Sequence, residues 1–578
     1  MGSYLDICCE RKTQTPIRYI ETTQETLAEQ EIQKEQSMIL NAKSRLPPTV
    51  MQMKIKTKNL IQKRTDSPYD HYIIEKNLGS GSFGNVYKVT HRNSHSIRAL
   101  KQIPKIYMTD GVSSNQISNE IQILRLLDHP NIMKIYEFYE DNDNFYILSE
   151  YCDQGDLKSK CEKHGTFSEF NVKFFMYQIF NAIAYLHQHQ VIHGDIKLEN
   201  ILLYANFRKS TKILRQFSAL NFESKRSSVI NELKGEQEDE PVTNNTFPYP
   251  KKALTSRTER YLKDLSNYEI KLIDFGCSKI FTRKKLKGII GTSIYCSPEV
   301  IDNEFNEKCD EWSCGILMYF LLAGEPPFYA ETEEELFNKI KNDELEFPKK
   351  KFNKISKECQ DLIRKLLTKN VNERITAVDA LKEPFFMNNI DFIDNTEAAL
   401  NEKEVRDTLN ELKNFHKSKS KFQEMVLAYI ALNYLDKDEE IKIKKIFRAI
   451  NKDHTKYQIS REEFTNFCRE FYSNEDLSEV DTDELFDLID SDKSGSIEYQ
   501  ELIRAMSDKE KLLNDENLKA AFDFFDVGKS GLITWDEINK VIFDGRVVDD
   551  SLMNEYLGQI GKKKDDTINF MEFCDLVK

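Results

Sequence analysis

The sequence predicts an α+β region followed by a separate all-α region. The chain has 578 residues, which is too many for one hydrophobic core and fits about three or four units of ordinary domain size. From Tyr72 onward, apolar residues alternate as in β-strands around a glycine-rich turn, and helical periodicity follows. After residue 436 the chain repeats a helix-loop-helix pattern as far as residue 578.

Acidic residues are concentrated in the last quarter of the chain. Residues 436–578 contain 35 Asp and Glu against 21 Lys and Arg, so they account for the whole net charge of −14. The chain shows no basic stripe of the kind that binds phosphate backbones, which argues against a nucleic-acid partner. Clustered carboxylates suit a hard divalent cation, although a solvated acidic surface would have the same composition.

The composition is typical of an intracellular protein. The longest apolar runs, such as residues 316–323, fall well short of the ~20 residues that cross a bilayer. The 11 Cys residues are scattered, without metal-type spacing or a secretory signal, and therefore indicate reduced thiols. We expect a cytoplasmic location.

Residues 1–68 form a polar arm, which we expect to be largely disordered. Gly2 at its start and the pair Cys8 and Cys9 resemble sites of myristoylation and palmitoylation. Two acyl chains would hold the protein at a membrane, but Asp6 stands where the motif has Ser or Thr. Membrane association and a simple solvated arm therefore stay open as alternatives.

A glycine-rich segment opens the α+β region. Residues 79–86 fit the pattern G-x-G-x-x-G-x-V, whose small residues let the backbone approach the phosphates of ATP. Lys101 on the following strand can hold two of these phosphates if Glu120 fixes its ammonium group. Singly, each of these residues would more often be a surface charge. The residues expected around ATP are Leu78, Gly79, Ser80, Gly81, Ser82, Phe83, Gly84, Val86, Lys101, Glu120 and Glu150.

Residues 193–200 carry the most specific pattern. They place Asp195, Lys197 and Asn200 just before a strand and resemble the catalytic loop of protein kinases. The resemblance implies that Asp195 accepts or orients the proton of a substrate hydroxyl and that Lys197 neutralises the transferring phosphoryl group. It further implies that Asn200, together with Asp274 of an Asp-Phe-Gly triplet, holds magnesium.

Three positions depart from the usual kinase pattern. Gly194 replaces the Arg that binds an activation-loop phosphate, so we expect activity without phosphorylation of that loop. Leu198 replaces a common Pro on the scaffold of the catalytic loop, and Ser149 is a small gatekeeper that predicts an enlarged back pocket. Lys197 and Thr292 resemble their counterparts in Ser/Thr kinases rather than in tyrosine kinases.

Two loops of the all-α region have the composition of calcium-binding EF-hands. The loop at 490–501 has oxygen-bearing side chains at the ligand positions and Gly495 at the tight turn. The loop at 526–537 keeps its ends but has Gly528 at position 3, which should weaken it. The expected calcium ligands are Asp490, Asp492, Ser494, Ser496 and Glu501 in the first loop, and Asp526, Ser530, Leu532 and Glu537 in the second.

Two further loops are degenerate. The loop at 451–463 lacks the central Gly and is one residue too long, and the loop at 561–572 has Gly and Lys where acids belong. We expect no tight calcium binding in the latter, and structural hands that pair with their neighbours. Four hands at roughly calmodulin spacing indicate a sensor rather than isolated acidic loops.

The segment 401–435 has the pattern of a regulatory helix. Its apolar residues at 422, 426, 429 and 430 form a helical stripe, and basic residues precede them. Such a helix suits the groove of a calcium sensor, whereas the plainer alternative is a connecting helix packed on the kinase.

A kinase, a basic junction and four hands in this order resemble the calcium-dependent protein kinases of plants, ciliates and apicomplexans. The resemblance implies an α+β bilobal protein kinase fold followed by an all-α EF-hand (calmodulin-like) domain. The expected parts are the arm 1–68, a kinase domain 70–387 with an insertion at 204–267, an autoinhibitory junction 388–435 and the EF-hand domain 436–578.

The same resemblance implies an activity and its partners. We expect phosphoryl transfer from ATP, with Mg²⁺, to Ser or Thr of proteins, and relief from autoinhibition when Ca²⁺ lets the sensor capture the junction. Glu199 and Asp156 lie where related kinases bind basic residues, which predicts basic substrate motifs. A calcium-switched pseudokinase scaffold is the alternative, and the intact set of catalytic residues argues against it.

Overall fold

The computed structural model of the chain divides into two compact units, residues 1–55 and 56–578, and every described residue belongs to the second. The predictions for the acylated arm, for nearly all of the insertion, for the basic part of the junction and for Ser82, Phe83 and Asp492 lie outside the described residues. Within the described part, no helix is long and apolar enough to cross a membrane. The structure describes residues 61, 63–64, 66–81, 84–107, 112–205, 268–281, 285–288, 290–387, 412, 420–451, 457–471, 481–491, 493–543 and 550–578.

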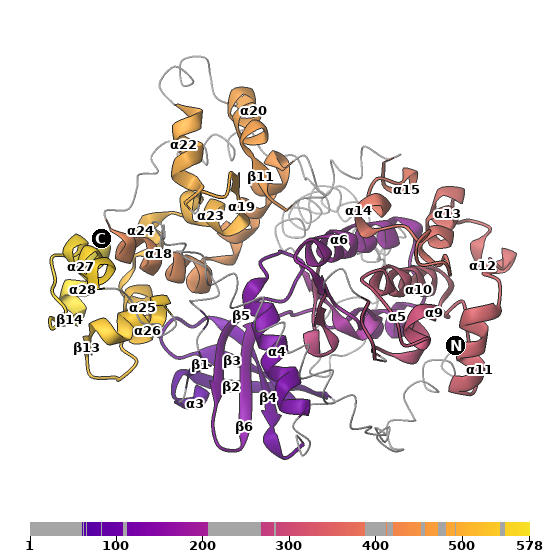
Figure 1. The fold of residues 1–578 in the computed structure, drawn as a ribbon, viewed down its shortest axis with the longest axis horizontal. Coiled ribbons are helices and arrows are strands. Elements are labelled where there is room, and N and C mark those ends of the chain that lie inside the picture. The colour runs from indigo at the N-terminus through magenta and orange to yellow at the C-terminus, as the bar shows by residue number, and fades with distance from the viewer. Residues whose placement is uncertain are drawn as a thin grey trace, which may run out of the picture. The chain divides into compact units, whose positions relative to one another are not determined.

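A six-stranded sheet forms the first lobe (Figure 1). The strand order is β1-β5-β6-β4-β3-β2, with β1 parallel to β5 and the other neighbours antiparallel. The glycine-rich turn joins β2 to β3, as predicted, and α4 carries Glu120. The elements are β1 (Lys63–Arg64), α3 (Pro68–His71), β2 (Tyr72–Gly81), β3 (Gly84–His91), β4 (Ile97–Pro104), η2 (Lys105–Tyr107), α4 (Val112–Leu126), β5 (Ile135–Glu140) and β6 (Asn144–Glu150).

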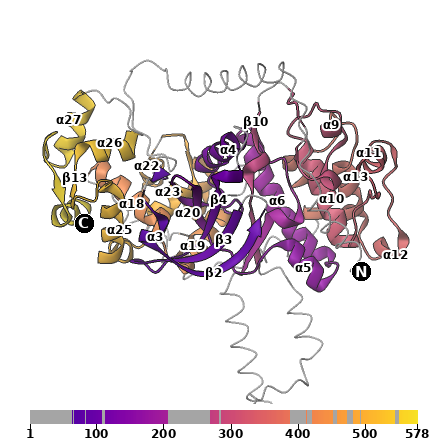
Figure 2. The ribbon, with the colours of Figure 1, turned by 90° about the horizontal axis from the view of Figure 1, so that it is seen from below.

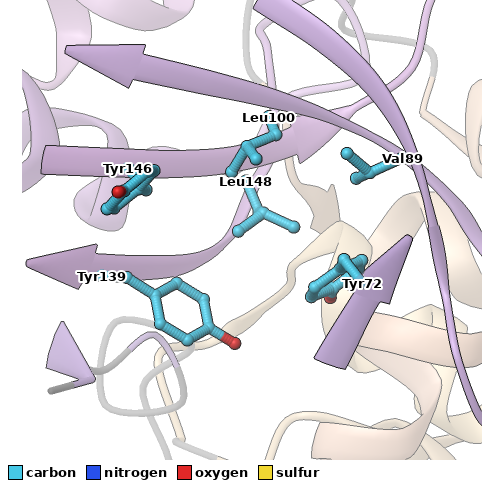
Figure 3. Packing of buried hydrophobic residues seen from close by; sticks show 6 residues of the cluster. All are labelled: Tyr72, Val89, Leu100, Tyr139, Tyr146 and Leu148. Atoms are coloured by element: carbon cyan, nitrogen blue, oxygen red, sulfur yellow. The ribbon is translucent and has the colours of Figure 1, made fainter. Parts of the chain in front are cut away.

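An apolar core fixes this sheet. It is built from Tyr72, Val89, Leu100, Tyr139, Tyr146 and Leu148 (Figure 3). Leu100 on β4 and Leu148 on β6 are partners across their ladder and are both fully buried. Because successive residues of a strand point to opposite faces, burial of Leu100 turns Lys101 toward the other face of the sheet.

The second lobe is helical and is centred on α6 and α10. Both helices are buried along most of their length. Ser168 begins α6 by accepting a hydrogen bond from the backbone of Asn171, and α10 ends at Gly324 in the left-handed conformation. Figure 2 shows α9 and α11 to α13 near α10. The helices are α5 (Leu157–His164), α6 (Glu169–Gln188), α9 (Pro298–Ile301), α10 (Cys309–Ala323), α11 (Glu333–Asn342), α12 (Lys349–Phe352), α13 (Lys357–Leu366), α14 (Ala377–Ala380) and α15 (Pro384–Met387).

Two small antiparallel ladders hold the polar loops between the lobes. The strand β7 (Val191–Ile192) pairs with β10 (Lys279–Ile280), and β8 (Ile201–Ala205) pairs with β9 (Tyr268–Leu272). The predicted insertion therefore connects two paired strands, as a long hairpin connection does. Short 3₁₀ turns follow the strands at η3 (Leu198–Asn200), η4 (Phe275–Cys277) and η5 (Ser293–Tyr295).

Four helix-loop-helix units make up the described residues after 436. A two-residue ladder, β11 with β12, joins the first and second units, and β13 with β14 joins the third and fourth. The prediction that each degenerate hand pairs with its neighbour is thereby confirmed. The units comprise α19 (Lys437–Ile450), β11 (Ile459–Ser460), α20 (Arg461–Phe471), α22 (Thr482–Ile489), β12 (Ser496–Ile497), α23 (Tyr499–Met506), α24 (Lys509–Leu512), α25 (Asp515–Phe525), β13 (Leu532–Ile533), α26 (Trp535–Phe543), α27 (Asp550–Gln559), β14 (Ile568–Asn569) and α28 (Phe570–Val577).

Candidate active site and calcium loops

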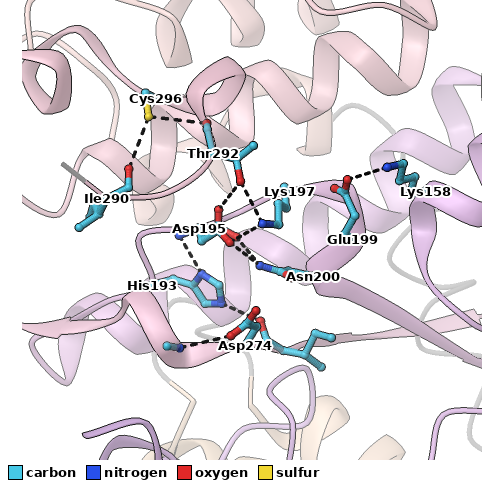
Figure 4. Close-up of polar contacts among 12 residues, drawn as sticks. Lys158, His193, Asp195, Lys197, Glu199, Asn200, Asp274, Ile290, Thr292 and Cys296 are labelled. Carbon is cyan, nitrogen blue, oxygen red and sulfur yellow. Dashed lines mark hydrogen bonds and ion pairs between the residues drawn. The ribbon is translucent and has the colours of Figure 1, made fainter. Parts of the chain in front are cut away.

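Two side chains of the catalytic loop, Asp195 and Lys197, meet Thr292, which lies 97 residues after Asp195 (Figure 4). The Thr292 hydroxyl donates to Asp195 Oδ1 at 2.9 Å and accepts from Lys197 Nζ at 2.9 Å. Lys197 Nζ also lies 2.6 Å from Asp195 Oδ2. The orientation of the Asp195 carboxylate is thus fixed by the Thr292 hydroxyl on one oxygen and the Lys197 ammonium on the other.

A buried histidine fixes the backbone of this loop. His193 Nδ1 accepts from the backbone N–H of Asp195 at 3.2 Å, and Nε2 donates to the carbonyl of Ile273 at 3.1 Å. Burial lowers the pKa of His193, so the ring is neutral, and these two bonds require the proton on Nε2. The ring also packs edge-on against Phe275 at 4.8 Å, which ties the catalytic loop to the Asp-Phe-Gly turn.

Asp274 and Asn200 offer hard oxygen donors of the kind that magnesium takes. Asn200 Nδ2 donates to Asp195 Oδ2 at 3.0 Å and to the Asp195 carbonyl at 2.9 Å, so these bonds use the amide nitrogen and not the amide oxygen. Asp274 has φ of 66° in the left-handed region, a strained conformation that persists where the surroundings impose it. The carboxylate and the amide oxygen fit a magnesium site.

Lys101 and Glu120 form the ion pair that the sequence predicted, with 3.5 Å between Nζ and Oε1. Burial alone would lower the pKa of Lys101, but the charges of Glu120 and Asp274 outweigh it and raise that pKa. For Glu120, burial is the stronger effect and raises its pKa in spite of Lys101. Lys101 therefore stays charged, which is the state in which a lysine could bind phosphate.

The other residues expected around ATP lie on the β2–β3 hairpin and on β6. A Cβ on Gly84 would lie 1.9 Å from the carbonyl oxygen of Gln102, so only glycine fits there. Glu150, at the end of β6, directs its carboxylate to Lys271 at 2.7 Å and to the backbone N–H of Lys134 at 2.8 Å. Its side chain is thus bound within the protein. Leu78, Gly79, Ser80, Gly81 and Val86 occupy the two strands of the hairpin.

Asp310 anchors the catalytic loop to α10. Its carboxylate accepts the backbone N–H groups of His193 at 2.9 Å and Gly194 at 2.8 Å. His187 binds the same carboxylate at 3.0 Å and Glu311 at 3.3 Å. Burial would lower the pKa of His187, but these two carboxylates raise it to about 10. The Asp310 carboxylate thus braces the catalytic loop, and Arg374 pairs with Glu299 at 2.9 Å.

An arginine could not replace Gly194 without straining the backbone. It has φ of 78°, and a Cβ there would lie 2.8 Å from Cδ1 of Ile290 and 3.0 Å from the carbonyl oxygen of Cys277. The activation segment is held by other means, because Leu286 forms a backbone bridge to Phe305 and packs in an apolar cluster with Ile290. Apolar contacts thus hold the activation segment, which in kinases with an arginine at this position is held by its bond to a phosphate.

The loop at 490–501 is closed by hydrogen bonds between its predicted calcium ligands and its own backbone. Asp490 accepts the backbone N–H groups of Ser494 and Gly495, both at 2.9 Å, and Glu501 accepts that of Ser491 at 2.8 Å. The Ser494 hydroxyl donates to the carbonyl of Ser496 at 2.9 Å. These bonds hold both acidic ends of the loop against its backbone, and Asp492 lies outside the described residues.

The loop at 526–537 repeats this geometry. Asp526 accepts the backbone N–H groups of Ser530 at 2.9 Å and Gly531 at 2.7 Å, and the Ser530 hydroxyl donates to the Leu532 carbonyl at 2.8 Å. Glu537 accepts the backbone N–H of Gly528 at 2.8 Å. The third hand therefore keeps the fold of a calcium loop while lacking a side-chain ligand at position 3.

The junction helix α18 (Lys421–Tyr434) lies among the EF-hand helices rather than flat on the kinase. Its predicted apolar stripe is fully used. Tyr429 stacks on Phe524 at 4.1 Å, and Phe422 contacts Phe525 and Phe573. Polar contacts from its first turns add to the apolar ones, since the Gln423 amide nitrogen donates to the Val577 carbonyl at 2.9 Å.

The last turn of α18 is bound by two cations of the kinase. Lys134 Nζ donates to the Leu432 carbonyl at 2.7 Å, and buried Arg98 donates to the Asn433 carbonyl. Carbonyls at the end of a helix have no partner within the helix and carry partial negative charge, so both cations are well placed there. These residues could not be predicted from the sequence, because no local pattern marks a cation that binds a helix 298 residues away.

Further contacts between the kinase and the EF-hands likewise have no local sequence signal. Glu269 on β9 pairs with Lys444 of α19 and lies 3.8 Å from Arg448; Glu269 and Lys444 are buried, and Arg448 is partly exposed. Tyr457, from the degenerate first loop, packs against the His129 ring at 4.4 Å. These contacts give the first hand a structural role that needs no calcium.

The two lobes, the paired catalytic side chains and the four EF-hands define a protein kinase fused to a calcium-binding module. Comparison with known families agrees, since the protein kinase domain matches residues 72–215 and 259–386. An EF-hand domain pair matches residues 440–507, and a single EF hand matches residues 518–542.

Similar proteins narrow this class. Calcium-dependent protein kinase 4 of Plasmodium berghei (strain Anka) is 30% identical over 512 residues, which cover 87% of this chain and 85% of that protein. Calcium-dependent protein kinase 3 of the same organism is 30% identical over 537 residues, covering 91% and 83%. The chain belongs to the calcium-dependent protein kinase family. It is a calcium-regulated Ser/Thr protein kinase with ATP, Mg²⁺ and Ca²⁺ as cofactors.

Proposed function

We propose that Asp195 accepts or orients the proton of a substrate Ser or Thr hydroxyl while Lys197 neutralises the phosphoryl group in flight. The observation that carries this proposal is the contact of Asp195 with both Lys197 and Thr292. Lys101, fixed by Glu120, binds phosphates of ATP, and Asn200 and Asp274 hold magnesium, which supplies charge neutralisation when bound. The calcium ligands are those of the loops at 490–501 and 526–537.

Basic residues near the phosphorylated hydroxyl are the proposed substrate feature. Glu199 is partly exposed and pairs with Lys158 at 3.0 Å, and Asp156 caps the start of α5. A substrate arginine would replace the Lys158 ammonium on Glu199, so Lys158 competes with the substrate. A Lys158→Ala variant should therefore show a lower KM for Arg-containing peptides and an unchanged KM for peptides without basic residues.

Calcium control acts through the junction in this proposal. Residues 388–435 hold the kinase inactive in the calcium-free state, and calcium strengthens the capture of α18 by the EF-hands. The contacts of Lys134 and Arg98 with the end of α18 support this coupling, because they form only when the helix is held in place. The domain limits 70–387, 388–435 and 436–578 follow from the same division of roles.

The decisive experiment measures transfer of radiolabel from ATP to a Ser-containing peptide with and without calcium. Glu501→Gln should abolish calcium stimulation and keep basal activity, since it removes charge from the loop at 490–501. Glu516→Gln, on the exposed first turn of α25, is the matched control. Full calcium stimulation of the Glu501→Gln protein would refute control by this loop.

We further propose a cytoplasmic protein that reaches membranes through acylation of Gly2, with Cys8 or Cys9 as the second anchor. Distribution of the Gly2→Ala protein between membrane and soluble fractions tests this. An unchanged distribution would contradict the proposal without affecting the kinase assignment.

A further inference from the structure

The fourth EF-hand loop differs from the second and third in how its ends are held. In the second and third loops an Asp at position 1 accepts backbone N–H groups from positions 5 and 6. Position 1 of the fourth loop is Gly561, which has no side chain to do this. The loop nevertheless closes, because β14 pairs with β13 and Glu572 at position 12 caps α28.

A lysine side chain occupies the middle of this loop. Lys562 Nζ donates to the Thr567 carbonyl at 3.0 Å and to Glu572 Oε1 at 2.9 Å. These two acceptors stand at positions 7 and 12, which supply a backbone carbonyl and a carboxylate to calcium in a binding loop. The Lys562 side chain is 19% exposed, so most of it is covered by the loop, whereas its partner Glu572 is 43% exposed.

The neighbouring residues show that this placement is specific. Lys563 and Lys564 follow directly in the sequence, and both are exposed. Only one of three consecutive lysines is therefore turned inward. In the second and third loops, the equivalent carboxylate oxygen of position 12 accepts a backbone N–H instead, from Ser491 and from Gly528.

We propose that the Lys562 ammonium permanently takes the place of a calcium ion in the fourth loop. The fourth hand then stays closed and paired with β13 in the absence of calcium, and the third hand is the calcium-dependent loop of this pair. The inference rests on the proposed role of residues 436–578 as a calcium sensor and adds how that sensor divides its work.

A permanently closed fourth hand has a consequence for the junction helix. α28 supplies Phe573, which packs against Phe422 of α18 at 5.8 Å, and Val577, whose carbonyl binds Gln423. The surface that holds the start of α18 is thus formed whether or not calcium is present. The fourth hand keeps the junction attached, and calcium at the other loops changes how firmly the rest of α18 is held.

The test is hydrogen–deuterium exchange of the full-length protein without calcium, followed in peptides that cover the loop 561–572. Lys562→Met should speed exchange of the β14 backbone at least tenfold, whereas Lys563→Met removes the same charge from an exposed side chain and should change nothing. Lys562→Arg keeps a cation in the loop and should stay close to the native protein. Equal exchange in Lys562→Met and the native protein, or equal acceleration in Lys563→Met, would overturn the proposal.

Glu572→Gln removes the same ion pair from its other end and keeps an oxygen for the cap of α28. It should reproduce the exchange of Lys562→Met, and adding Lys562→Met to it should have no further effect. If Lys562→Met unfolds the whole pair of hands, peptides from α25 will also exchange fast. The exchange rate of the Glu572→Gln protein then tests the proposal instead. A native exchange rate in Glu572→Gln would overturn the proposal.

Terbium luminescence excited through Trp535, at position 10 of the third loop, gives an independent reading. Lys562→Met should weaken terbium binding by the third hand about fivefold, because its partner strand is no longer held. Loss of a nearby positive charge alone would strengthen binding, so the sign separates the two explanations, and tighter binding would overturn the proposal. Neither readout involves kinase activity, so failure here leaves the proposed calcium control of phosphorylation intact.

Discussion

The catalytic loop and the calcium loops hold their charged groups in different ways. Asp195 is positioned by Thr292, which lies 97 residues away, and the backbone of its loop is held by Asp310. Asp490 and Glu501 are positioned by backbone groups of their own 12-residue loop. The active site is thus assembled by the whole lobe, whereas each calcium loop is assembled locally.

This difference predicts how each region responds to change. A calcium loop can lose or gain a ligand within its own twelve residues, as the third and fourth loops do, and still keep its fold. The active site cannot, because each of its groups depends on helices and strands that are far apart in sequence. Substitutions should therefore have larger effects at the active site than in the calcium loops.

The largest effect is expected for Asp195→Asn. Loss of the proposed proton acceptor, together with its contact to Lys197, should reduce phosphorylation of a Ser peptide on the order of 10³-fold. Terbium binding by the calcium loops should stay unchanged, which sharpens the contrast between the two regions. Asp302→Asn, at an exposed site, is the control, and a fall of less than tenfold in Asp195→Asn would contradict the assignment.

A smaller effect is expected for His187→Gln, which leaves Asp310 and Glu311 buried without their cation. The free energy of unfolding should fall by about 3 kcal/mol near pH 6. The folded-state pKa of His187 is raised to about 10, so its contribution is complete below about pH 6.5 and is lost as the pH rises toward 10. The native protein should therefore lose stability across this window, and the variant should not.

Urea unfolding followed by tryptophan fluorescence measures this difference in stability. The chain has two tryptophans, so a single substitution leaves one reporter. Trp535→Phe leaves Trp312, on α10 beside Glu311, as the only reporter. A native protein whose stability is constant between about pH 6.5 and pH 10 would show that His187 is not the charged partner of the two carboxylates.

The same contrast explains what the sequence could predict. The glycine-rich turn, the catalytic loop and the calcium loops are local patterns, and the structure has each of them on the expected strands and loops. The binding of α18 by Arg98 and Lys134 joins residues some 300 positions apart, and no local pattern marks it. Lys563, at position 3, was visible as a missing acid, but position 2 supplies no ligand in the usual pattern. The role of Lys562 therefore needs the loop geometry, in which Lys563 is exposed and Lys562 is not.

The next prediction concerns Gly194, whose close neighbours come from a distant part of the chain. Gly194→Ala should cost about 2 kcal/mol of stability and lower activity, because its left-handed backbone is crowded by Ile290. Gly165→Ala is matched in φ, at 77°, but meets no atom within 4 Å and should cost only about 1 kcal/mol. Equal losses in the two variants would mean that crowding by the activation segment adds nothing.

The smallest effect is expected in the third calcium loop, where Gly528→Asp restores a carboxylate at position 3. We expect calcium affinity of this hand to rise about tenfold, equivalent to about 1.4 kcal/mol. A Cβ at this position would lie 3.2 Å from Glu537 Oε1, so without calcium the added charge repels Glu537, and calcium relieves that repulsion. Terbium luminescence through Trp535 measures the change, and Gly528→Asn separates charge from shape. If Gly528→Asn gains as much as Gly528→Asp, the weakness of the third hand is a matter of loop stiffness rather than of a missing ligand.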